Sequence, residues 1–321
     1  MVELVKRARH MAVGLVTTTE IQDAMPAAMF AHTRRGSEYL TIMDQYLHPS
    51  PSADVIMGGV AASLLPQSTA SSRRKDNRDL FKEFATKGYH VITTRAEPQA
   101  AGAPDKLLGL FHMVEGGLMD KQVHPLDWPR AVWDTIELDK AVGVAKKWAV
   151  AHWDNTLIIV VADHVHSLSI TGTYWEGDGK KGREAVRVYG ETTFLDYDDA
   201  DGDGFPEQVD VSRSLAIHWA NHLDYYEHDK VLQEPFAPTV KEGEKWVANK
   251  QCAEDGALQT GNLPSSENNA VHTVEGVPLT ASGPGAEQFH TTMDNTEVFF
   301  AIVNALGLDA RQGTSPFVAT R

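Results

Sequence analysis

The sequence has almost no cysteine and no long apolar run, and each shortage excludes a kind of protein. Cys252 is the only cysteine among 321 residues, so the chain can form no internal disulfide and no zinc site built from cysteines. The longest apolar runs, such as Leu157–Ala162, are far shorter than the roughly 20 residues that cross a bilayer. We therefore expect a chain without a membrane span.

Basic residues are also scarce relative to acidic ones. The chain has 29 Lys and Arg against 44 Asp and Glu, which gives a net charge of −15. This excess of negative charge argues against a nucleic-acid partner and against docking on anionic membranes. What the sequence does contain is 42% apolar residues, enough for a substantial core, and 14 histidines beside the 44 carboxylates. This composition therefore allows metal sites built from nitrogen and oxygen ligands.

Short apolar runs rich in β-branched residues alternate with helical patterns, which is typical of α/β proteins. The strongest helical pattern covers Trp128–Ala151, with Asp127 as the expected N-cap, and a second covers Thr296–Leu306. Residues 66–79 form a polar loop in this prediction. Residues 167–270 have weak periodicity and many turn residues, so we expect a cap-like insertion over the sheet. The expected strands are Ala12–Thr18, Asp54–Met57, His90–Thr94, Gly109–Val114 and Thr156–Ala162.

Carboxylates and imidazoles occur together at two places in patterns that suit a metal ion. Asp120 and His124 are four residues apart, so a helical turn would put both on one face. The plain alternative is a surface Asp–His pair. Asp163, His164 and His166 directly follow the last expected strand, whose consecutive apolar residues predict burial on both faces. The carboxyl end of such a strand is where open α/β folds bind ligands, although Asp163 and His164 can converge only if the chain leaves strand geometry. The alternative there is a helix N-cap followed by a solvated histidine.

Several stretches, in the same order and at the same spacing, resemble the alkaline phosphatase family. They are Gly14–Ala28, Phe111–His124, Asn155–His166, His272–Pro278 and Ser282–Ala286. The resemblance covers most of the chain and is least clear over residues 167–270. It implies one α/β domain over residues 1–321, with a mostly parallel central sheet flanked by helices on both faces. It also implies hydrolysis of phosphomonoesters through a phosphoserine, with two zinc ions and usually one magnesium ion.

The resemblance implies zinc ligands at five positions of this sequence. The first zinc would be bound by Asp120, His124 and His272, and the second by Asp163 and His164. Carboxylates and neutral imidazoles suit zinc. Two cations close together can stabilise the attacking and the leaving oxygen of an in-line displacement.

Four further residues are similar to family positions around those ions. Glu115 resembles the magnesium carboxylate, and Asp23 resembles a group just behind it. His166 resembles a histidine that lies behind the zinc ligands. Lys121 matches a lysine that bacterial-type members place near the phosphate, so the resemblance implies a catalytic contact to phosphate or water at this residue.

The sequence also departs from the family pattern. The family's covalent nucleophile is the serine of an Asp-Ser-Ala motif, and this chain contains no Asp-Ser dipeptide. Met25 stands where the family has a threonine on magnesium, and a thioether is a poor partner for a hard cation. Gly36 stands at the position of the phosphate-binding arginine, directly after Arg34 and Arg35.

One internal segment is shorter than in the family. Leu107–Phe111 resembles one family segment and Met113–Glu115 a later one, without the helical stretch that separates them elsewhere. Together with the missing nucleophile motif, this predicts a shortened relative that lacks the N-terminal region of the family.

A candidate calcium loop lies within the expected insertion. Asp199, Asp201 and Asp203 occupy loop positions one, three and five, Gly204 the turn at six, and Asp210 position twelve. This pattern matches an EF-hand loop, except that the last residue is Asp rather than Glu. The alternative is an acidic, solvated turn.

A second histidine pair, His218 and His222, has helical spacing. No glutamate follows His218 to act as a catalytic base, and no third ligand is apparent. We therefore expect these two histidines to lie on the face of a helix without a metal role.

The expected function is phosphomonoester hydrolysis of the alkaline phosphatase type, with little or no activity in this chain. Its partners would be a phosphomonoester or inorganic phosphate. Its metal ions would be two zinc ions, one magnesium ion and a calcium ion at residues 199–210. Family members often form homodimers and mostly act outside the cytoplasm, so the resemblance implies a periplasmic or secreted full-length protein. The alternative is a non-catalytic zinc- and calcium-binding protein derived from the family.

Overall fold

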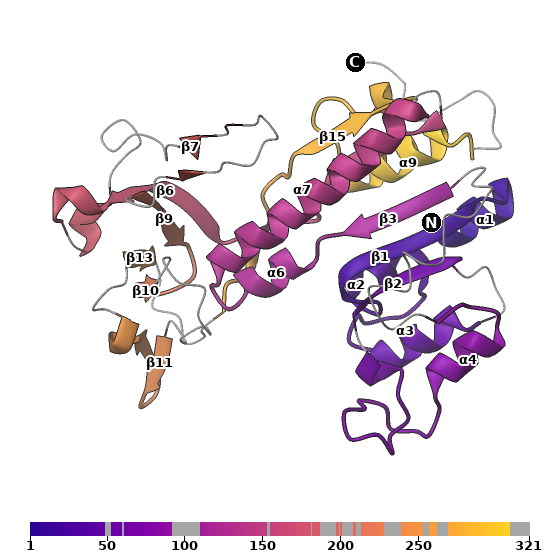
Figure 1. The fold of residues 1–321 in the computed structure, drawn as a ribbon, viewed down its shortest axis with the longest axis horizontal. Helices are drawn as coiled ribbons and strands as arrows, with labels where there is room; N and C mark the ends of the chain where they lie inside the picture. The colour runs from indigo at the N-terminus through magenta and orange to yellow at the C-terminus, as the bar shows by residue number, and fades with distance from the viewer. Residues whose placement is uncertain are drawn as a thin grey trace. The chain divides into compact units, whose positions relative to one another are not determined.

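A computed structural model describes residues 1–48, 53–59, 61–91, 110–152, 155–180, 182–186, 197–198, 200, 208–209, 213–227, 239–252, 257–261 and 269–308. The chain divides into two compact units, drawn in Figure 1. The first unit comprises Met1–Leu118, Glu137–Ile159 and Thr280–Arg321, and the second comprises Met119–Ile136 and Val160–Leu279. In the described part of the chain, no helix has both the length and the apolar character of a membrane span.

The first unit contains a parallel three-stranded sheet. Its central strand β1 (Ala12–Glu20) lies between β2 (Val55–Gly59) and β3 (Leu110–Glu115), and both neighbours run parallel to it. Parallel neighbours require crossover connections, and helices α2, α3 and α4 lie in those connections (Figure 1). The carboxyl ends of β1 and β3 are therefore at the same edge of the sheet.

Helices complete the first unit. They are α1 (Val2–Arg9), α2 (Ala24–Phe30), α3 (Tyr39–Tyr46), α4 (Leu80–Thr86), α9 (Asn295–Ala305) and the short 3₁₀ turns η1 (Ala61–Ser63) and η6 (Ala286–Gln288). The side chains of β1 alternate, and Val13 and Leu15 face a core that includes Val2 and Val5 of α1. Helix α9 begins with a capping box between Asp294 and Glu297.

A buried arginine organises the loop that precedes α4. The side chain of Arg74 is 1% exposed, and its Nε and Nη2 atoms each lie 2.7 Å from a carboxylate oxygen of Asp76. Its Nη1 donates to the carbonyl oxygen of Ser63 at 3.4 Å. The predicted polar loop is thus held by a bidentate ion pair rather than by apolar packing.

The second unit is built mainly from antiparallel strands. Its four-stranded sheet has the order β10 (Tyr225–Glu227), β13 (Ala257–Gly261), β9 (Arg213–Trp219) and β6 (Leu168–Trp175). Trp219 and Tyr225 are fully buried in its core, and the indole N–H of Trp219 donates to Tyr225 Oη at 2.6 Å. The remaining elements are α6 (Leu118–Val123), β5 (Val165–His166), β7 (Tyr197–Asp198), β8 (Gln208–Val209), β11 (Thr239–Glu242), β12 (Lys245–Ala248), β14 (His272–Thr273), η3 (Glu176–Asp178), η4 (Gly182–Ala185) and η5 (Lys250–Cys252).

The predicted elements compare with the structure as follows. Helix α7 has the predicted bounds, Trp128–Ala151. The predicted strand His90–Thr94 lies mostly outside the described residues. Strand β4 (Ile158–Val161) is only partly buried, contrary to the expected cover on both faces, because it pairs in a separate two-stranded sheet with β15 (Leu279–Ser282). Among the described residues the α/β fold is therefore present, but the sheet is small and fragmented.

Candidate metal centre

One turn of helix holds Asp120 and His124 together. Asp120 lies within α6, and the backbone N–H of His124 donates to its carbonyl oxygen at 3.1 Å. The Nε2 atom of His124 is 3.2 Å from Asp120 Oδ1. The spacing of four residues thus places both side chains on one face, as the sequence predicts.

A bend after β4 brings two more imidazoles to the same carboxylate. The chain leaves strand geometry after Val161, bends at Asp163 and resumes a strand at β5. His166 Nε2 lies 2.9 Å from Asp120 Oδ1, and His164 Nε2 lies 3.8 Å from it. His164 Nε2 is also 3.2 Å from Asp163 Oδ2. The departure from strand geometry that the sequence requires is therefore present.

Strand pairing supplies the last imidazole. Strand β14 pairs antiparallel with β5, which sets His272 opposite His166. His272 Nε2 lies 3.0 Å from Asp120 Oδ1 and 3.1 Å from His124 Nε2. A residue 152 positions along the chain from Asp120 thus reaches it through a two-residue ladder.

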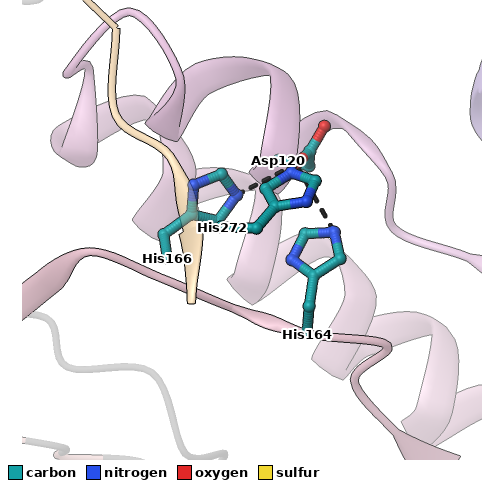
Figure 2. A group of neighbouring side chains, drawn as sticks. All are labelled: Asp120, His164, His166 and His272. Atoms are coloured by element: carbon teal, nitrogen blue, oxygen red, sulfur yellow. Dashed lines mark hydrogen bonds and ion pairs between the residues drawn. The ribbon is translucent and has the colours of Figure 1, made fainter. Parts of the chain in front are cut away.

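These side chains form one group within the second unit. Figure 2 shows His164, His166 and His272 around Asp120, and one ligand atom from each lies within 4.8 Å of the others. The Asp120 side chain is 23% exposed and that of His166 is 11% exposed, whereas His272 is half-exposed. A partly buried, nitrogen-rich group of this kind suits a transition-metal ion.

Burial and charge set the protonation states of the group. Burial alone would raise the pKa of Asp120, but the nearby His124 and hydrogen bonds from His166 and His272 lower it below its ordinary value. Burial lowers the pKa of His166, although its hydrogen bond to Asp120 opposes that change. An ionised carboxylate beside a neutral imidazole is the state in which both bind a metal ion.

The group is anchored to the core of the second unit. His124 Nδ1 lies 2.8 Å from the carbonyl oxygen of Ala270, whose own N–H donates to the His124 carbonyl at 2.8 Å. Ala270 and Leu126 are buried with Trp219 in the core of this unit. Because its Nδ1 faces that carbonyl, His124 presents Nε2 to Asp120, which is the arrangement usual for metal-binding histidines.

The other residues of the predicted zinc and phosphate sites lie at the edge of this group. Lys121 Nζ is 3.4 Å from Asp120 Oδ2, and the lysine is half-exposed. The Asp163 side chain is 53% exposed.

The Nδ1 atoms of His164 and His166 are buried and have no hydrogen-bond partner in the described part of the chain.

The predicted magnesium residues belong to the first unit. Glu115 ends β3 and accepts a hydrogen bond from Thr17 Oγ1 at 2.6 Å. Asp23 is the N-cap of α2, and its carboxylate accepts from the N–H of Ala24 at 2.9 Å. Met25 follows in the first turn of that helix. Oxygen ligands such as these suit magnesium, and their role stays a prediction.

The remaining candidates of the sequence have different outcomes. The calcium-loop residues Asp199, Asp201, Asp203 and Asp210 lie outside the described residues. The prediction of a helix for His218 and His222 is wrong: His218 lies on β9, whose long-range pairing overrides the local spacing, and His222 lies in the turn that follows. His166 Nε2 lies 2.9 Å from Asp120 Oδ1, so it contacts a predicted zinc ligand, and its place behind the ligands stays a prediction.

Comparison with known proteins shows which family the chain is similar to. The model of the family described as alkaline phosphatase matches residues 2–112 and 105–308. Alkaline phosphatase from Gadus morhua is 26% identical over 92% of this chain and 69% of its own length. Alkaline phosphatase 4 from Bacillus subtilis is 26% identical over 88% of this chain and 65% of its own length. The chain thus spans about two thirds of these relatives.

Solved structures agree at the level of the fold. Alkaline phosphatase from the Antarctic bacterium TAB5 is similar with a TM-score of 0.58 at 16% identity, over 96% of this chain and 76% of that one. The Thermus thermophilus enzyme has a TM-score of 0.58 at 23% identity, over 96% and 73% of the two chains. Because the family model matches most residues of this chain, the chain belongs to the alkaline phosphatase family.

Proposed function

We propose that this chain is a metal-dependent, phosphomonoester-binding protein of the alkaline phosphatase type. The observation that carries the proposal is the convergence of four imidazoles on one carboxylate. His124, His164, His166 and His272 all present Nε2 to Asp120 Oδ1, within 3.8 Å. These residues come from three separate segments of the chain, so the group is a product of the fold rather than of local sequence.

Asp120, His124 and His272 are the proposed ligands of a first zinc ion, and Asp163 with His164 those of a second. The donors fit this metal because carboxylate and neutral imidazole are its usual protein ligands outside cysteine sites. Zinc bound there would supply Lewis-acid polarisation of a phosphoryl oxygen. The pKa of Asp120 lies below its ordinary acidic value, so the side chain is ionised at neutral pH and its negative charge balances part of the charge of a bound cation.

Three residues outside the zinc ligands have proposed supporting roles. Lys121 Nζ, half-exposed and 3.4 Å from Asp120 Oδ2, would contact a phosphate oxygen as a point charge. Glu115 is the proposed magnesium carboxylate, with Asp23 as its neighbour in the family pattern. Their oxygen donors match the preference of magnesium for hard ligands.

For this chain we propose little or no turnover. Its sequence holds no serine in the family's nucleophile context, so the covalent route has no nucleophile. Met25 and Gly36 replace a magnesium ligand and a charged phosphate contact of the family. The two matches to the family model share residues 105–112, which supports an internally shortened sequence at that point.

Zinc content, phosphate binding and turnover test this proposal separately. Dialysed protein is expected to retain zinc, and His272→Ala to lose it. Zinc-loaded protein is expected to bind inorganic phosphate in calorimetry, and His164→Ala to bind it much more weakly. His152→Ala, at an exposed position in the turn directly after α7, is the matched control and should change neither. Metal-free protein with an unchanged His272→Ala variant would refute the metal centre.

Turnover is measured with a chromogenic phosphomonoester, added zinc and magnesium, and protein free of host phosphatase. We expect a rate far below about one per second, the lower end of ordinary enzymes. A rate at or above that value, abolished by Asp120→Ala, would refute the proposed loss of activity.

The second candidate function is a non-catalytic zinc- and calcium-binding protein derived from the family. The absence of an Asp-Ser dipeptide from this sequence and the calcium-loop pattern in the sequence of residues 199–210 favour it. Zinc and calcium binding without any phosphate binding would support this second function against the first.

A further inference from the structure

Two buried threonines lie beside Glu115 at the carboxyl end of the parallel sheet in the first unit. Thr17 and Thr19 of β1 are 7% and 6% exposed. The register of the parallel pair β1–β3 sets Thr17 directly beside Glu115, the last residue of β3. The carboxyl edge of such a sheet is where open α/β folds place ligand-binding residues. Buried hydroxyl groups are almost always hydrogen-bonded, so their partners show what they hold in place.

The hydrogen bonds of Thr17 fix the direction of its proton. A hydroxyl group has one proton to donate and two lone pairs that accept. Thr17 Oγ1 accepts the backbone N–H of Thr19 at 2.9 Å and donates its proton to Glu115 Oε2 at 2.6 Å. Thr19 Oγ1 lies 2.8 Å from Thr17 Oγ1, and it is the donor of that pair because the Thr17 proton is already used. The bond to Glu115 has the length of a hydroxyl donating to an ionised carboxylate, about 2.5–2.7 Å.

An irregularity in β1 produces this arrangement. The pairing of β1 with β2 shifts register between Val16 and Glu20, and within this interval the N–H of Thr19 donates to the Thr17 side chain. Bulges and similar irregularities are frequent next to active sites, where they redirect a side chain. The chain after β3 is held against β1 as well, because the N–H of Leu118 donates to Thr18 Oγ1 at 3.1 Å.

A glycine leaves room beside the other oxygen of Glu115. A Cβ atom at Gly117 would lie 2.7 Å from Glu115 Oε1 and 2.8 Å from Thr19 Cγ2. A side chain at this position would therefore crowd the carboxylate, and glycine keeps the space clear. Carboxylate oxygens are the hard donors that magnesium prefers. The residues present thus fit the magnesium ion that is proposed at Glu115.

We propose that Thr17 is a positioning residue that holds the Glu115 carboxylate in the orientation that binds magnesium. This inference rests on the proposed function, which makes Glu115 the magnesium carboxylate. Thr17 acts through Glu115 rather than as a ligand, because its proton is committed to Oε2 and its lone pairs to Thr19. Hydrogen-bond partners that orient a metal ligand contribute about 10- to 100-fold to metal affinity.

Manganese binding to the zinc-loaded full chain, measured by electron paramagnetic resonance, tests this role. The manganese that Glu115→Gln fails to bind defines the Glu115 site and separates it from manganese bound elsewhere. Thr17→Val removes the hydroxyl at similar shape and should weaken the Glu115 site by about 10- to 100-fold. Thr17→Ser keeps the hydroxyl and should bind manganese nearly as tightly as the parent chain. Thr86→Val is the matched control, an exposed threonine of α4 whose hydroxyl donates to a backbone carbonyl, and it should change nothing.

Gly117→Ala is a second test, which does not depend on the folding of Thr17→Val. It leaves the hydrogen bonds of Thr17 in place and puts a methyl group beside Glu115 Oε1. A carboxylate held by Thr17 cannot turn away from that methyl group without losing its hydrogen bond, so the Glu115 site should weaken. A carboxylate that is free to reorient would bind manganese as before.

The outcomes separate this inference from the function on which it rests. Absence of any Glu115-dependent manganese in the parent chain would refute the magnesium role in the proposed function, and this inference with it. Parent-like affinity in Thr17→Val or Gly117→Ala would overturn the positioning role alone, and so would a Thr17→Ser variant as weak as Thr17→Val. A purely structural hydrogen bond would lower the free energy of unfolding of Thr17→Val and leave its manganese affinity unchanged.

Discussion

Neutralising Asp120 should remove most of the zinc affinity, whereas the same change at Asp163 should not. Asp120 is the carboxylate on which the imidazoles converge, with three Nε2 atoms within 3.2 Å. Asp163 is half-exposed, and its carboxylate lies near His164 at 3.2 Å. Asp120→Asn and Asp163→Asn are therefore a matched pair: each loses one charge with almost no change in volume.

The expected magnitude follows from the number of ligands. Apparent binding free energies of about 10–16 kcal/mol, known for zinc sites with four protein ligands, correspond to about 3 kcal/mol for each protein ligand. Asparagine leaves a neutral oxygen in place, so we expect a loss near that value, about a hundredfold in Kd. Asp163→Asn should change the affinity for the first equivalent of zinc by less than about tenfold.

Competition with a chromophoric chelator near neutral pH measures both affinities. Thermal unfolding gives an independent measure, because zinc at about 100 times the parent Kd stabilises the native state by about 2.7 kcal/mol, which falls to about 0.4 kcal/mol after a hundredfold loss. Equal affinities for the two variants would show that Asp120 is not the centre of the site.

Three further predictions concern other parts of the chain. Arg74→Met should lower the free energy of unfolding, measured by urea titration, by about 2 kcal/mol. The substitution removes two charged hydrogen bonds to Asp76, and water can replace part of their energy because Asp76 is half-exposed. The exposed Lys82→Met is the control, and an equal effect of both substitutions would contradict the role of burial. Burial lowers the pKa of His222, so the unfolded state binds more protons than the native state below about pH 6.5. The free energy of unfolding should therefore fall as the pH drops through that value. His222→Gln should show a shallower decline, and identical pH profiles of the variant and the parent protein would refute this. Calcium should raise the unfolding temperature, and Asp201→Ala should abolish the increase; no calorimetric heat with calcium would exclude the loop as a site.

The sequence alone determined the features that depend on neighbouring residues. Helix α7 follows from its periodic apolar positions and its Asp127 N-cap, whose carboxylate accepts the N–H of Arg130. The meeting of Asp120 and His124 follows from a spacing of four residues on one helical turn. These are local properties, with energies set within a few residues, so they can be recognised without the rest of the chain.

Tertiary structure alone decided which distant residues meet. His272 reaches Asp120 because β14 pairs with β5 in one register, and a shift of one residue would turn its side chain to the other face. The same ladder includes His166, whose Nε2 lies 2.9 Å from Asp120 Oδ1. His218 lies on a strand despite helical spacing, because β9 pairs with β6 and β13 on either side. Pairing partners and their register depend on the packing of the whole unit, and local periodicity carries no information about them.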